Sequence, residues 1–154
     1  MKIIVLIARI IQAIFALLTL GFAIAVVNWF NMKSGKASPG AFNVLVAVPL
    51  VALLALFYLE VVPRIAPSAS HPIPSLVCEA IPIILYLAGC GVAAHFVMRL
   101  DTCLGIICTC AKMAPVFAGL SVPLWIFTTI LMVKQIFTHG FRRPSASRPA
   151  MSQA

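Results

Sequence analysis

The sequence predicts an all-α integral membrane protein, a four-helix bundle with short loops. Hydrophobic residues make up 63% of the 154 residues and charged residues only 9%. The mean hydropathy is +1.14. A soluble domain carries about 25% charged residues. With so few charges, most of the surface of this protein is unsuited to water, and a lipid bilayer is the solvent that fits.

Four long apolar stretches occupy most of the chain, at about 10–30, 43–63, 76–98 and 113–133. Each is long enough to span a bilayer, because a helix needs about 20 residues to cross the hydrocarbon core. Lipid offers the backbone no hydrogen-bond partners, so each stretch is expected to be an α-helix. The chain therefore divides into a four-span transmembrane domain at 1–139 and a disordered, basic tail at 140–154.

The first stretch also has one feature of a secretory signal peptide. Ala-Ile-Ala at 23–25 has the small-x-small form of a cleavage site. Against this, Arg9 interrupts the apolar core that such a peptide requires, and the stretch 10–30 is long enough to span. We therefore expect an uncleaved first span.

Three loops are expected between the spans, at 28–42, 63–75 and 99–112. The second loop holds four prolines and is predicted to be stiff and non-helical. The termini and the second loop together hold seven Lys and Arg residues, whereas the first and third loops hold four. Because positive charge favours the cytoplasmic side, both termini are predicted to be cytoplasmic.

Small residues recur at a spacing of four in three of the stretches: Gly21 and Ala25, Gly89 and Ala93, and Ala114 and Ala118. Such pairs let helix backbones approach closely in a membrane. Packing within one chain is the favoured interpretation, and a contact between two copies is the alternative.

The net charge of +8 raises the question of nucleic acid. The basic residues are dispersed at the ends of the apolar stretches, which favours anionic lipid headgroups over a nucleic-acid surface. The chain has no glycine-rich nucleotide loop, zinc-helix motif or nucleophile elbow. We expect no enzymatic activity, no cofactor and no bound metal.

Four polar residues fall near the predicted cytoplasmic ends of the spans: Arg9, Gln12, Glu60 and Glu79. Ionisable groups inside a membrane are costly, at about 2.5–3.5 kcal/mol each on insertion scales. We predict that Arg9 pairs with Glu79 or Glu60, with Gln12 one turn deeper on the same helix face. The alternative is that each group extends separately to the headgroups.

The cysteines separate by position. Cys103, Cys108 and Cys110 fall in the third loop, which the charge count places outside the cell, where a disulfide from Cys103 to either of the others is permitted. Free loop cysteines are the alternative, and the spacing matches no zinc pattern. Cys78, near the cytoplasmic interface, is a candidate for S-acylation, with a buried structural thiol as the alternative.

The tail places Ser145 two residues after the basic pair Arg142 and Arg143. That arrangement suits a basophilic kinase, and a phosphate there would offset the attraction of these residues and Arg148 to anionic lipid. A solvated tail that only sets the topology is the favoured interpretation, because three arginines make a weak cluster.

The segment RIIQAIFALLTLG at 9–21 resembles the opening helix of fungal four-span MARVEL-domain (membrane-associating domain) proteins. That helix begins with a basic residue, an apolar pair and a glutamine, and continues with a Phe-Ala-Leu run. The last third is similar too, since three cysteines precede an apolar helix at 112–131 that contains Phe117 and Trp125. The resemblance covers about residues 5–137.

This resemblance implies a four-helix bundle with cytoplasmic termini, in the plasma membrane or an endomembrane. It also implies a role in membrane apposition, microdomain organisation or vesicle trafficking. The expected partners are membrane lipids, with anionic headgroups or sterol-rich domains as candidates, and further copies of the chain or other membrane proteins. A small transporter or channel subunit is the alternative function, and it requires polar groups that line a path. A membrane-embedded enzyme requires a reactive cluster and is the weakest hypothesis.

Overall fold

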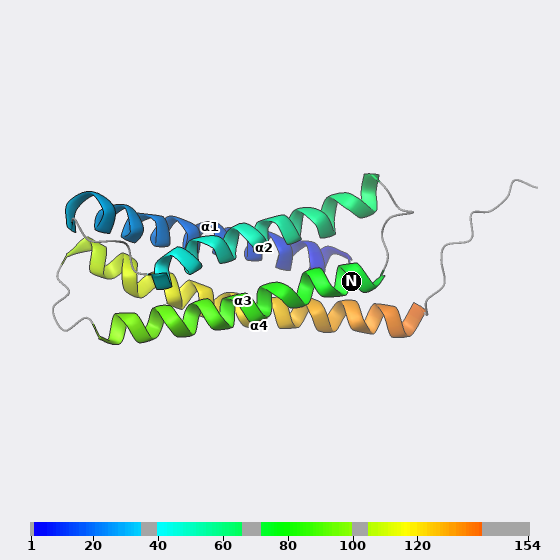
Figure 1. Cartoon of the computed structure of the whole chain (residues 1–154). Coiled ribbons are helices and arrows are strands. Elements are labelled where there is room, and N and C mark those ends of the chain that lie inside the picture. Colours follow the sequence, from blue (N-terminus) through cyan, green and yellow to red (C-terminus); the bar gives the residue numbers. More distant parts are fainter. Residues whose placement is uncertain (1, 35–39, 66–71, 100–104, 140–154) are drawn as a thin grey trace, which may run out of the picture.

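The computed structural model describes residues 2–34, 40–65, 72–99 and 105–139. Its elements are α1 (Lys2–Trp29), the short π-helix η1 (Phe30–Ser34), α2 (Gly40–Ile65), α3 (Pro72–Met98) and α4 (Ile106–His139). Successive α-helices run in opposite directions (Figure 1). Helix α1 therefore begins at the end of the bundle where α4 finishes. We call this the termini end, and the opposite one the far end.

The four α-helices form one bundle in which α1 and α3 each pack against α2 and α4. The order around the bundle is therefore α1, α2, α3, α4, with α1 diagonally opposite α3. This is the up-down-up-down arrangement that short connections favour. The predicted all-α four-helix membrane bundle is confirmed.

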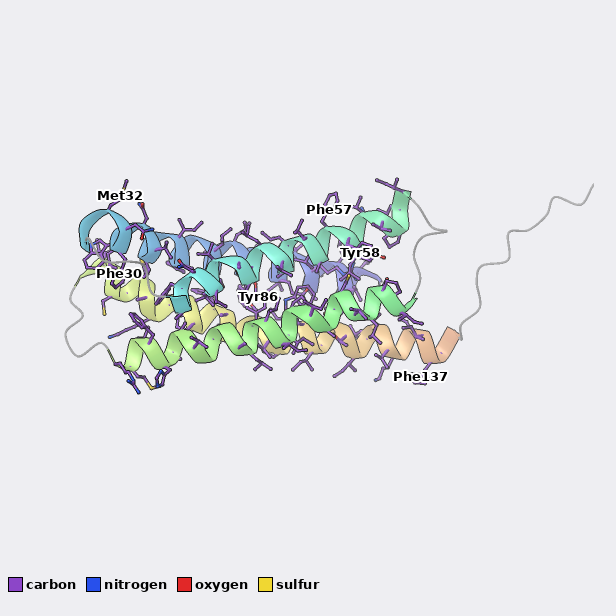
Figure 2. The ribbon with its side chains drawn as sticks, viewed as in Figure 1. Phe30, Met32, Phe57, Tyr58, Tyr86 and Phe137 are labelled. Carbon is purple, nitrogen blue, oxygen red and sulfur yellow. The ribbon has the colours of Figure 1, made fainter. Side chains whose placement is uncertain are left out.

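The outside of the bundle is apolar along its length. Four segments are long and apolar enough to cross a membrane: Ile3–Met32, Gly40–Ile65, Ile73–Met98 and Ile106–Thr138. Within each segment, only 28–39% of the most apolar stretch of 18 residues is buried inside the protein. Most of these side chains therefore face outward. Figure 2 shows Phe57 and Phe137 on the outside of the ribbon, and both are more than 60% exposed. Such a surface fits lipid, and the chain is an integral multi-pass membrane protein.

The core contains one large ring from each of three helices. Phe42 of α2, Tyr86 of α3 and Trp125 of α4 are each at most 1% exposed. Helix α3 packs closely against α2 at Gly89, where an added Cβ would lie 3.2 Å from Leu45 Cδ1. Glycine therefore allows this close approach, as expected for small residues between membrane helices.

The helices extend beyond the predicted spans. Helix α1 begins at Lys2 rather than near residue 10, and α4 begins at Ile106 rather than near residue 113. The predicted proline-rich loop was also too long, because Pro72 and Pro74 lie in the first turn of α3. The first turn of a helix tolerates proline, since its backbone N–H groups have no partner within the helix.

The start of α4 also corrects the predicted third loop. Cys108 and Cys110 belong to the first turns of α4 rather than to a loop. Gly105 precedes them with a φ of 97°, a left-handed conformation that favours glycine. Its carbonyl accepts hydrogen bonds from the backbone N–H groups of Cys108 and Thr109, and the helix begins there.

Candidate functional site

Three helices bring one charged residue each into contact near the termini end of the bundle. These are Arg9 on α1, Glu60 on α2 and Glu79 on α3. At 1.5 Å per residue, Arg9 and Glu79 lie about 10 Å from the first residues of their helices. The charges therefore lie deeper inside the helices than the predicted span boundaries suggested, because α1 and α3 begin earlier.

The guanidinium of Arg9 contacts both carboxylates. Its Nη1 donates a hydrogen bond to Glu60 Oε2 at 3.0 Å, and its Nη2 donates to Glu79 Oε1 at 3.4 Å. The side chain of Glu79 is only 2% exposed and that of Arg9 is 14% exposed. The sequence left Glu60 and Glu79 as alternative partners, whereas the structure places one arginine between the two. The contact with Glu79 crosses the bundle diagonally, from α1 to α3.

Two further residues complete this group. Arg64, one turn after Glu60 on α2, forms an ion pair with Glu60 Oε1. Thr129 of α4 has its hydroxyl 3.3 Å from Glu79 Oε2 and 2.8 Å from the carbonyl oxygen of Trp125, and it donates its single proton to one of them at a time. We call Arg9, Glu60, Arg64, Glu79 and Thr129 the charge cluster. All four helices contribute to it.

Gln12 lies one turn deeper on α1, as predicted from the sequence, but its partner is on α4. Its Nε2 donates to Thr128 Oγ1 at 3.1 Å, and Thr128 in turn donates to the carbonyl oxygen of Trp125. Gln12 is 1% exposed. Three buried polar atoms here and in the nearby core have no partner among the described residues: Arg9 Nε, Gln12 Oε1 and Tyr86 Oη.

Sequence reasoning missed Arg64, Thr128 and Thr129 as members or neighbours of this site. Each had a signal. Arg64 follows Glu60 by four residues, the spacing at which two side chains meet on one helix face. The two threonines are adjacent polar residues inside an apolar stretch, where a hydroxyl seeks a partner on another helix or on its own backbone.

The charge cluster is balanced, with two arginines and two glutamates. Removing charges from water costs several kcal/mol per ion, and their mutual attraction recovers this only when the geometry is good. The cluster is therefore better suited to fixing which helix faces meet than to adding stability. Among the residues that the structure describes, no group of three or more His, Cys, Asp or Glu side chains is placed to hold a metal ion.

The predicted cysteine sites have different surroundings. Cys108 is disulfide-bonded, whereas Cys110 carries a free thiol. Cys103 lies outside the described residues, and its pairing stays a prediction. Cys78 is free and half-buried, and it packs against the core. S-acylation of Cys78, and the structural thiol that the sequence left as the alternative, stay predictions.

The predicted tail sites, which are Ser145, Arg142, Arg143 and Arg148, all lie outside the described residues. Their phosphorylation and lipid attraction stay predictions.

Comparison with known protein families matches residues 2–131 to the MARVEL membrane-associating domain. The match includes the first three helices and most of α4, and every member of the charge cluster lies within it. No curated protein and no solved structure matches the chain. The family match covers far more than half of the sequence and agrees with the four-helix membrane bundle. The chain belongs to the MARVEL family of membrane-associating domains.

Proposed function

We propose that this protein is a non-catalytic membrane protein that organises lipid and protein microdomains and assists membrane apposition or vesicle trafficking. The observation that carries the proposal is the contrast between the outside and the inside of the bundle. The outside is apolar along its length, and the strongest polar interactions face inward and join all four helices. Such a molecule offers the membrane a large, continuous lipid contact.

The basic tail supports the same role at the membrane surface. Residues 140–154 carry Arg142, Arg143 and Arg148 and no acidic residue. With cytoplasmic termini, as the distribution of Lys and Arg favours, this tail would face a leaflet rich in anionic lipid. Each arginine near such a surface contributes about 1 kcal/mol of attraction.

Reconstitution tests this proposal. The full chain, with a fluorescent tag after the tail, is placed in giant vesicles that contain phosphatidylcholine, sterol, sphingolipid and fluorescent phosphatidylserine. We expect the protein to concentrate in patches and to enrich phosphatidylserine there. The variant with Arg142, Arg143 and Arg148 changed to Gln should keep the patches but enrich less phosphatidylserine.

An even distribution of protein and lipid in every composition would overturn the proposal. Solute or ion flux through the same vesicles, absent from protein-free vesicles, would replace it with the transporter or channel alternative.

A further inference from the structure

Helices α3 and α4 leave an apolar groove between them on the far half of the bundle. Its volume is about 510 Å³, within the range of about 300–1,000 Å³ usual for ligand pockets. One residue stripe from each helix lines it: Cys90, Ala94 and Met98 on α3, and Lys112, Pro115 and Gly119 on α4, with their neighbours. The spacings of three and four residues place each stripe on one helix face.

The groove exists because small residues face each other across it. Gly119 has no side chain, and a Cβ added there would lie 3.5 Å from Cys90 Sγ, at ordinary contact distance. Ala94 contributes only a methyl group. The Cys90 thiol donates to the carbonyl oxygen of Pro115 at 3.2 Å, so its polar atom is already engaged. The space that remains open between the two helices is the apolar groove.

The length of the groove suits part of an extended hydrocarbon chain. Cys90 and Met98 are eight residues apart on α3, which corresponds to about 12 Å along the helix axis. Both helices are membrane spans, so a groove on their outer side meets lipid rather than water. An unfilled apolar groove loses dispersion contacts along its walls, and an acyl chain supplies them.

One end of the groove is positively charged. Lys112 lines it from α4 and is exposed, and it forms no ion pair with any residue that the structure describes. Arg99, directly after the end of α3, is exposed as well. A lysine on a membrane helix reaches the headgroup region with its ammonium while its stem stays in apolar surroundings. A lysine ammonium attracts the phosphate of an anionic headgroup. By the topology predicted from the distribution of Lys and Arg, this end of the groove faces the outer leaflet, so the lipid would come from that leaflet.

The geometry points to a binding site for an anionic phospholipid, with one acyl chain in the α3–α4 groove and the headgroup phosphate at Lys112. This inference rests on the proposed function and adds to it a second lipid contact, in the half of the bundle opposite the basic tail. The test of this inference maps the residues that a lipid contacts, whereas the test of the proposed function measures where the protein collects in the membrane. The inference and the proposed function can therefore fail independently.

The experiment uses the full chain in phosphatidylcholine vesicles that contain phosphatidylglycerol with a diazirine in its acyl chain. After illumination, mass spectrometry maps the labelled peptides. We expect labelling to concentrate at 90–98 and 112–120. Gly119→Leu, which fills the groove, should abolish this concentration. Gly91→Leu is the matched control, because Gly91 is exposed on α3 with nothing within 4 Å of an added Cβ.

Charge is tested separately with an exposed residue whose change leaves the packing intact. Lys112→Gln should lower groove labelling by phosphatidylglycerol about fivefold, towards that of a phosphatidylcholine probe with the same diazirine. Lys134→Gln, exposed near the other end of α4, should leave it unchanged. Helix content by circular dichroism checks that every variant folds.

Three results would overturn the inference. The first is labelling spread evenly over the four helices. The second is groove labelling that persists in Gly119→Leu or is equal for the two lipid probes. The third is a chain-to-chain cross-link at 90–98 or 112–120 in a parallel reaction with a bifunctional amine cross-linker, which would assign the groove to a second copy of the protein.

Discussion

Arg9 is the residue on which the charge cluster depends. Its guanidinium contacts Glu60 and Glu79 through different nitrogens, and the remaining cation, Arg64, pairs only with Glu60. Without Arg9, the buried carboxylate of Glu79 would keep the hydroxyl of Thr129 but lose its countercharge. A charge left in that position carries the full cost of its desolvation.

We therefore expect Arg9→Met to lower the free energy of unfolding by about 3–5 kcal/mol, the usual effect of removing one partner of a buried pair. Titration with a denaturing detergent, followed by circular dichroism, measures it. The control is Arg64→Met, because the side chain of Arg64 is 68% exposed. This change should lower the free energy of unfolding by less than about 1 kcal/mol. Adding Glu79→Gln to Arg9→Met should restore part of the stability, and equal effects of the two arginine variants would contradict this account.

Thr128 provides a second test, at a neutral hydrogen bond. Thr128→Val removes the acceptor for Gln12 Nε2, and we expect a loss of about 0.6–1.7 kcal/mol, the range measured between membrane helices. The same unfolding titration measures it. Thr138→Val is the control, because the exposed hydroxyl of Thr138 bonds only to the backbone of its own helix.

A double-mutant cycle then identifies the cause. Gln12→Leu in the Thr128→Val background removes the unpaired amide and should recover stability. If the two losses simply add, Gln12 and Thr128 are not coupled, and the contact has no energetic role.

Between elements, α3 packs closely on α2 at Gly89. An added Cβ would lie 3.2 Å from Leu45 Cδ1 and 3.4 Å from Val48 Cγ2. We expect Gly89→Leu to overpack this contact and to lower the free energy of unfolding by about 1–3 kcal/mol. Gly91→Leu on the same helix meets open space and should be neutral or stabilising. Unfolding titrations compare the two variants. Leucine has a higher helix propensity than glycine, so a similar loss in both would point to a changed lipid contact instead of packing at Gly89.

The α4 helix shows how packing overrides local sequence signals. The polar and cysteine-containing residues before 113 look like a loop, yet Ile106–Lys112 is helical. Ala111 and Ala114 are buried against the core, so tertiary contacts extend the helix by two turns towards the far end. Gly105 then ends the extension with its positive φ.

For the whole molecule, four antiparallel spans put both ends of the chain on the same side of the membrane. We predict the cytoplasmic side, from the excess of Lys and Arg on the termini and second loop. A tag at each end, with protease added to sealed vesicles of known orientation, measures this. Both tags should be cut only from the cytoplasmic face. Loss of the N-terminal tag before protease treatment would indicate cleavage of the first span, and tags on opposite sides would contradict the four-span topology.

The charge cluster could be predicted in part. Arg9, Glu60 and Glu79 stood out because ionisable residues are rare in membrane spans, and their predicted depths agreed. What depth alone could not decide was which glutamate meets Arg9. In the structure both glutamates contact Arg9, because α1 packs directly against α2 and its arginine reaches across the interior of the bundle to α3.

By itself, the sequence determined that lipid surrounds the protein, that its spans are helical, and how many spans it has. Hydropathy acts along the chain, and a backbone in lipid has to satisfy its own hydrogen bonds, so these properties follow from local composition. The tertiary structure decided which face of each helix points inward, the partners of Gln12 and Arg9, and the α3–α4 groove. In a membrane, lipid and protein interior are both apolar, so hydrophobicity marks no inner face, and only the packing of four helices around small and polar residues selects one.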